Sequence, residues 1–127
     1  MDFREYQTAA VRTESKVSPE IQERLKNVAR ILHGAMGLQT ESAELTDALK
    51  KHVFYGKPID EINLAEEVGD LLWYCAILCE ALGIEMEVVA KANVHKLKLR
   101  YGEKFSEEGA LFRNLEAEGK GLEGDLS

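Results

Sequence analysis

Residues 60–82 read DEINLAEEVGDLLWYCAILCEAL, and this stretch decides the fold. Its apolar side chains recur at helical spacing over a wide arc, and Gly83 follows as a natural helix end. A helix that is apolar on nearly all sides has to be covered on most of them. A chain of 127 residues has little room to cover it alone. The pattern therefore predicts a homo-oligomer with this helix at the subunit interface.

Working outward, the same periodicity predicts three further principal helices. Ser18-Pro19 is typical of a helix start, and the apolar pattern that follows reaches Gly34 and Gly37, where we expect a bend or a break. The expected segments are a helix from Pro19, a second stretch over 36–53, the helix at 60–82, a fourth helix over 85–101, and a short amphipathic helix within 2–13. No segment alternates as a strand does, so the predicted fold is all-α and resembles a four-helix bundle.

The C-terminal residues differ from the rest of the chain. Four glycines, at positions 109, 119, 121 and 124, are interspersed with acids, and apolar residues are sparse. Such a composition favours irregular structure. We therefore predict a helical domain over residues 1–105 and an irregular tail over 106–127.

Charge and hydropathy exclude several function classes. The chain carries 16 basic and 23 acidic residues, a net charge of -7, which argues against a nucleic-acid polymer as partner. The longest apolar run, 71–79, is far shorter than the ~20 residues that span a bilayer, so no membrane partner is expected. The first residues lack the apolar core of a signal peptide. We expect a cytoplasmic protein with Cys75 and Cys79 as reduced thiols.

Four acids form the main candidate site. Glu41 and Glu44 are three residues apart on one predicted helix, and Glu67 and Asp70 are three apart on the next. Each pair shares a helix face beside an apolar stripe, so both pairs are expected at the seam between packed helices. Crowded carboxylates next to a core repel one another, and bound Mg²⁺ or Mn²⁺ would relieve that repulsion. The residues alone leave a solvated acidic face as an equal alternative.

Other familiar sites are excluded by spacing. None of the three histidines has a glutamate three positions earlier, so the E-x-x-H motif of di-iron bundles is missing. The cysteines and histidines lack zinc-site spacing. The chain has neither a G-x-x-x-x-G-K-[ST] loop nor a G-x-G-x-x-G motif, so no standard nucleotide-binding fold is predicted.

The predicted fourth helix carries a second polar set. Asn93, Lys96 and Arg100 share one face, with Tyr101 beside them. These side chains can bind phosphate oxygens and a base. A basic last turn that complements the helix dipole is the alternative, and the residues alone favour it.

Taken in order, these residues resemble the MazG-like all-α nucleoside triphosphate pyrophosphohydrolases. The family's E-x-x-E and E-x-x-D motifs correspond to Glu41 through Glu44 and Glu67 through Asp70, with 22 residues, 45–66, between them. The surroundings are similar over about residues 3–105, including Gly37-Leu38, the segment 66–74 and the segment from Asn93 to Phe105.

The resemblance implies Mg²⁺-dependent hydrolysis of a nucleoside triphosphate to its monophosphate and pyrophosphate, as nucleotide-pool house-cleaning. The four acids would hold the metal, with Mn²⁺ as an alternative, for attack of water at the α-phosphorus. Some relatives have a further acid where this chain has Thr40, so Glu41 is our first choice as the base. The expected nucleotide-binding residues are Asn93, Lys96, Arg100, Tyr101 and, for the base, Trp73.

The same resemblance leaves alternatives open. A phosphoribosyl-ATP pyrophosphatase or a dUTP/dCTP-selective enzyme would share these motifs. A non-catalytic helical interaction module is the competitor from another class. The intact set of four acids disfavours it, because an unused site tolerates the loss of its residues.

Overall fold

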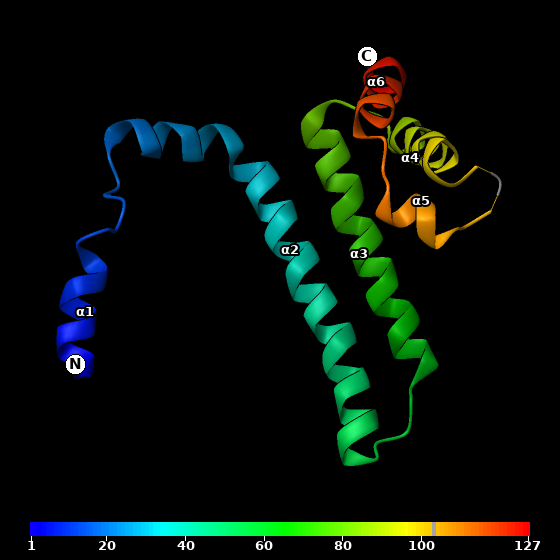
Figure 1. Ribbon diagram of the computed structural model, residues 1–127. Helices are drawn as coiled ribbons and strands as arrows, with labels where there is room; N and C mark the ends of the chain where they lie inside the picture. The colour runs from blue at the N-terminus through cyan, green and yellow to red at the C-terminus, as the bar shows by residue number, and fades with distance from the viewer. Residues whose placement is uncertain (103) are drawn as a thin grey trace.

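The computed structural model describes residues 1–102 and 104–127, and within them it contains six helices and no strand. The two central helices are α2 (Pro19–Tyr55) and α3 (Glu61–Leu82), which pack against each other and run in opposite directions (Figure 1). The remaining helices are α1 (Phe3–Val11), α4 (Met86–Tyr101), α5 (Glu107–Leu111) and α6 (Leu115–Leu126). The predicted all-α fold class is confirmed.

Local signals explain where the central helices begin and end. Ser18 caps α2, since its hydroxyl accepts a hydrogen bond from the Ile21 N–H at 3.3 Å. Asp60 caps α3 in the same way, at 3.0 Å from the Asn63 N–H. Gly56 and Gly83 close the two helices with φ of 68° and 69°, a left-handed conformation that glycine adopts without strain.

The structure corrects the expected separation of the helix that begins at Pro19 from the helical stretch over 36–53. Helix α2 is continuous across Gly34 and Gly37, although Figure 1 shows its N-terminal part turned relative to the rest. Both glycines are buried against α3. A methyl carbon on Gly34 would lie 2.7 Å from Cγ of Leu78, and one on Gly37 would overlap the Tyr74 ring. The glycines therefore allow two helices to approach closely and do not end one.

The prediction of an irregular tail is wrong. Residues 106–127 form α5 and α6, each with a side-chain cap: Ser106 accepts from the Gly109 N–H and Asn114 from the Ala117 N–H. Helix α6 packs along α4, as Figure 1 shows at the C-terminal end of the chain. The boundary between residues 105 and 106 as a domain division stays a prediction.

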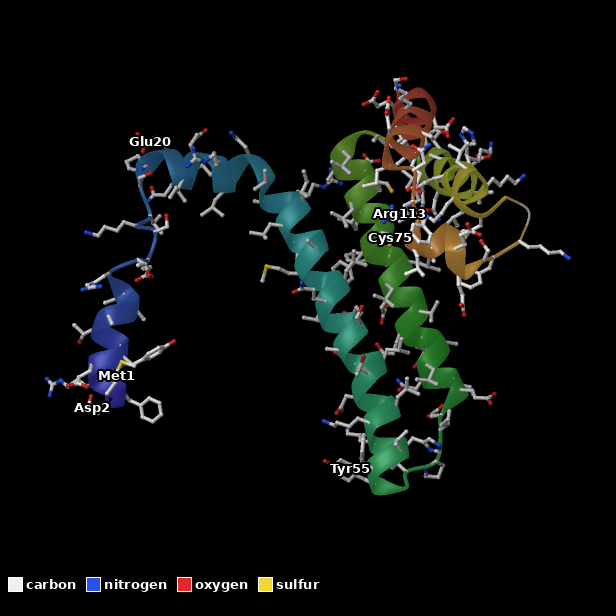
Figure 2. The ribbon with its side chains drawn as sticks, in the orientation of Figure 1. Met1, Asp2, Glu20, Tyr55, Cys75 and Arg113 are labelled. Carbon is white, nitrogen blue, oxygen red and sulfur yellow. The ribbon has the colours of Figure 1, made fainter. Side chains whose placement is uncertain are left out.

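The apolar faces of this chain are largely uncovered. Among the described residues, Ala92 is the one buried hydrophobic residue, at 1% exposed. On α3, Leu72 and Trp73 are 53% and 54% exposed. Helix α1 contacts no other helix of the described chain, and Phe3 on it is 92% exposed. Figure 2 shows Met1 and Asp2 at the free end of α1, well away from the α2–α3 pair. No described helix combines the length and the apolarity needed to cross a membrane.

Candidate metal centre

Three of the four predicted acids converge where α2 and α3 pack together. One carboxylate oxygen from each of Glu41, Glu67 and Asp70 can be chosen so that all three lie within 4.8 Å of one another. Glu41 comes from α2, and the other two come from successive turns of one face of α3. The i, i+3 spacing of Glu67 and Asp70 thus brings both of them to Glu41 across the helix seam, and the role of these acids as metal ligands stays a prediction.

Glu67 is the innermost member of this acidic cluster. Its side chain is buried, with the residue 7% exposed, whereas Glu41 is half-buried and Asp70 is exposed. Oε1 of Glu67 accepts a hydrogen bond from Nδ2 of Asn63 at 3.3 Å. Oε2 is buried and has no hydrogen-bond partner in the described chain. A buried carboxylate oxygen without a partner is costly, so the site calls for a ligand such as a cation.

The electrostatics of the cluster also indicate a site for a cation. The pKa of Glu41 is raised above its ordinary value, first by partial burial and then by the repulsion of Glu44, Asp70 and Glu67. A divalent cation placed among these oxygens would reverse that repulsion. Carboxylate oxygens alone, without nitrogen or sulfur donors, are the ligands that suit Mg²⁺ and Mn²⁺. The residues present therefore fit such an ion.

Glu44 lies at the edge of the cluster. It is exposed, and it is not one of the three acids whose oxygens converge, but it is near enough to raise the pKa of Glu41. Together with Glu67 it lines a cavity of about 1130 Å³ between the C-terminal half of α2 and the start of α3. Other lining residues include Asp47, Lys51, Leu49, Pro58, Ile59 and Asn63. This volume is ample for a nucleoside next to the acids.

Asp47 and Lys51 line this cavity and form an ion pair on α2, and Asp47 forms a second ion pair with Lys50. Asp47 contacts Nζ of Lys51 at 2.6 Å and Nζ of Lys50 at 2.8 Å. Hydrogen bonds from these two ammonium groups lower the pKa of Asp47 to about 2, and the contact raises the pKa of Lys51. Both side chains therefore remain charged at neutral pH beside the acidic cluster.

The close packing of α2 and α3 explains why the acids meet. Gly37 lies one helical turn before Glu41, and Tyr74 lies one turn after Asp70. The Tyr74 ring fills the space that a side chain at position 37 would need. It is held edge-to-face against Trp73, at 4.9 Å between ring centroids, and against His33, at 6.0 Å. This contact sets the spacing of the helices next to the site.

The predicted nucleotide-binding residues of α4 are distributed differently. Arg100 is 14% exposed in its side chain and forms a bidentate ion pair with Glu118 of α6, at 2.9 Å and 2.8 Å. Its guanidinium carbon also lies 5.6 Å from the centre of the Tyr101 ring. Lys96 and Tyr101 are half-buried and Asn93 is exposed. The structure thus assigns Arg100 a protein partner that the sequence did not reveal.

Trp73 is half exposed and packs against Tyr74. Neither it nor any of the four α4 residues is among the described residues that line the cavity at Glu44 and Glu67. In this single chain the α4 residues therefore do not share the cavity that Glu44 and Glu67 line.

Sequence reasoning missed two residues near these groups. Asn63 precedes Glu67 by one helical turn, a spacing that could have suggested their contact. Glu118 is 4% exposed and also accepts from Arg113 at 2.8 Å. Those hydrogen bonds from Arg100 and Arg113 lower the pKa of Glu118 to about 2. No local pattern announces a pairing across 18 residues.

The fold and the acidic cluster define an all-α protein with a helix-borne candidate site for a divalent cation. A protein-family model, that of the MazG nucleotide pyrophosphohydrolase domain, matches residues 33–105, which is more than half of the chain. The chain belongs to this family. The activity of that domain is, in general terms, hydrolysis of a nucleotide pyrophosphate bond. Neither the curated proteins nor the solved structures provide a match.

Proposed function

We propose that the protein is a Mg²⁺-dependent nucleoside triphosphate pyrophosphohydrolase that removes unwanted nucleotides from the cellular pool. The overall reaction converts a nucleoside triphosphate and water to the monophosphate and pyrophosphate. The observation that carries the proposal is the convergence of Glu41, Glu67 and Asp70, together with an oxygen of Glu67 that is buried and has no hydrogen-bond partner in the described chain. Family membership supplies the reaction class.

The four acids would hold the cation, with Glu44 as the outer member. When bound, a divalent cation would neutralise phosphate charge and favour attack by water at the α-phosphorus. Glu41 is the proposed proton acceptor, because its carboxylate faces those of Glu67 and Asp70 across the helix seam, where the cation and the attacking water would lie. Thr40 cannot take that part, and its hydroxyl donates to the Gly37 carbonyl at 3.0 Å.

The nucleoside is proposed to enter the cavity that Glu44 and Glu67 line, since its walls combine apolar and polar side chains. Asn93, Lys96 and Tyr101 are proposed to bind the nucleotide from α4, and Trp73 to contact its base. Arg100 could join them only if phosphate replaced Glu118 as its partner. Because α4 does not line the cavity in one chain, a second copy is the proposed source of these groups.

The uncovered apolar surface supports a homodimer or homotetramer. Helix α1 contacts no other helix of the described chain, and Leu72 and Trp73 leave a half-exposed apolar face on α3. Exposed apolar surface of this extent marks a protein interface. The free thiols of Cys75 and Cys79 suit a reducing compartment, so we place the reaction in the cytoplasm.

The test is a panel of canonical, deoxy and damaged nucleoside triphosphates assayed with Mg²⁺, with Mn²⁺ and with chelator. We expect pyrophosphate release with either metal and none with chelator. A Glu67→Gln variant should lose activity, whereas Glu66→Gln, its exposed neighbour, should retain it. Orthophosphate as the first product would overturn the proposed reaction. A phosphoribosyl-ATP or dUTP/dCTP preference would show as one strong substrate in the panel.

A further inference from the structure

Glu67 holds its two carboxylate oxygens in different surroundings. Oε1 accepts the hydrogen bond from Nδ2 of Asn63, whereas Oε2 is buried without a partner in the described chain. A carboxylate with two equivalent free oxygens can rotate, but one that is held at Oε1 presents a single defined oxygen. The bond from Asn63 therefore selects Oε2 as the oxygen that is left to bind a cation.

The position of Asn63 suits it to this task. It lies one helical turn before Glu67 on α3, so the two side chains share a face. Its main-chain N–H is already used in the cap of α3, donating to Oδ1 of Asp60 at 3.0 Å. The side-chain amide takes no part in that cap. Its role is thus separable from helix formation, because any other residue except proline would keep the cap.

We propose that Asn63 is a positioning residue for the metal ligand Glu67, which it orients without binding the metal itself. This inference rests on the proposed function, since it requires Glu67 to be a ligand. Hydrogen-bond partners of ligating carboxylates fix their orientation, and their loss typically weakens metal binding by about 10- to 100-fold. The amide is a neutral donor, so it orients Glu67 without cancelling the negative charge that attracts the cation.

The alternative is that Asn63 binds the metal directly through its own oxygen. The two roles differ in whether the effect of position 63 depends on Glu67. A positioning residue acts through Glu67, so Asn63→Ala should weaken metal binding in the unaltered protein and have no effect once Glu67 is changed to Gln. A direct ligand should weaken binding in both backgrounds when it is removed.

The experiment measures Mn²⁺ affinity of the full chain without nucleotide, by electron paramagnetic resonance and by calorimetry. The variants are Asn63→Ala, Glu67→Gln and the double change Asn63→Ala with Glu67→Gln. Val68→Ala is the matched control, since Val68 adjoins Glu67 on α3, is 47% exposed and is not among the residues that line the cavity. Thermal unfolding in chelator reports whether each variant is folded.

We expect about 10-fold weaker Mn²⁺ binding in Asn63→Ala and no further loss when this change is added to Glu67→Gln. Val68→Ala should bind as the unaltered protein does. Unchanged affinity in a folded Asn63→Ala, or a further loss when this change is added to Glu67→Gln, would overturn the positioning role and leave the proposed function standing. If the unaltered protein binds no Mn²⁺, the proposed function and this inference fail together.

Discussion

Replacing Gly37 with alanine tests how the helix packing creates the site. A methyl carbon at this position would lie closer than 3.0 Å to Cε1, Cζ and Cδ1 of the Tyr74 ring. Ordinary contacts of such atoms begin at about 3.5 Å. The ring cannot swing away freely, because it packs edge-to-face against Trp73 and His33. Either these contacts are lost or α2 and α3 move apart.

The expected change in unfolding free energy of Gly37→Ala is the sum of two opposing contributions. Overpacking of this kind typically costs about 1–3 kcal/mol, and three close ring atoms place Gly37 near the upper end. Alanine in a helix interior returns about 0.5–1 kcal/mol relative to glycine. The expected net loss is therefore about 2 kcal/mol of unfolding free energy. Because Gly37 is one turn from Glu41, the separation should also weaken Mn²⁺ binding.

Gly69→Ala is the matched control. Gly69 is also a helical glycine beside the acids, but a methyl carbon there would meet no atom of the described chain within 4 Å. This variant should gain about 0.5–1 kcal/mol and bind Mn²⁺ normally. A third variant, Gly37→Ala with Tyr74→Leu, should recover part of the loss, because the smaller side chain makes room.

The assay is urea unfolding in chelator at one fixed protein concentration, with Mn²⁺ titration of each folded variant. Fixed concentration matters because an oligomer's stability depends on it. If Gly37→Ala were as stabilising as Gly69→Ala and bound Mn²⁺ fully, the close contact between Gly37 and Tyr74 would not control the site.

Three further predictions follow from the charges and surfaces. Protons compete with the cation at Glu41, so Mn²⁺ affinity should fall as the pH falls through the raised pKa of this residue. Calorimetry at several pH values should find that Mn²⁺ affinity depends less steeply on pH in Glu41→Gln. The pKa of Glu118 is lowered from 4.5 to about 2, so its stabilising contribution is complete above pH 4.5 and is lost as pH falls toward 2. Limited proteolysis should then detect release of α6 in acid, and already at neutral pH in Glu118→Gln; equal protection of both proteins would contradict this. Leu72→Glu, on the exposed face of α3, should dissociate the oligomer in light scattering, and a monomeric unaltered protein would contradict the proposed interface.

Much of the fold could be predicted from local signals. Ser18-Pro19 and Asp60 are helix starts in the sequence and in the structure, and Gly83 ends α3 in both. The continuity of α2 could not be predicted in this way. A glycine disfavours a helix locally, but Gly34 is compensated by packing against Leu78, a residue 44 positions later, which only the folded chain reveals.

The structure of residues 106–127 likewise could not be predicted from local signals. The glycines there predict irregular structure, yet α6 forms because α4 supports it. Gly121 lies so close to α4 that a methyl carbon there would be 2.9 Å from Cδ1 of Leu99. Glu118 adds the ion pair to Arg100. Both contacts join segments that are far apart in sequence, and intrinsic helix propensity does not include such tertiary contacts.

For the candidate site, the spacing of the acids in the sequence identified which of them could meet. It did not predict that they differ in burial and in their place within the cluster. The two i, i+3 pairs predicted that all four acids lie at one helix seam, and Glu41, Glu67 and Asp70 converge there, while their role as metal ligands stays a prediction. Burial of Glu67 and the outer place of Glu44 depend on how the two helices are rotated against each other, which spacing leaves undetermined. Asn63 was missed because an amide without charge gives no signal of its own.

The central claim is hydrolysis at the α-phosphorus by a metal held on these acids, and the position of oxygen from water tests it most directly. The protein is incubated in ¹⁸O-labelled water with Mg²⁺ and a nucleoside triphosphate that it hydrolyses, and the products are analysed by mass spectrometry. Attack at the α-phosphorus places the label in the nucleoside monophosphate and none in pyrophosphate. Label in pyrophosphate or in orthophosphate, or equal turnover in chelator, would contradict the account.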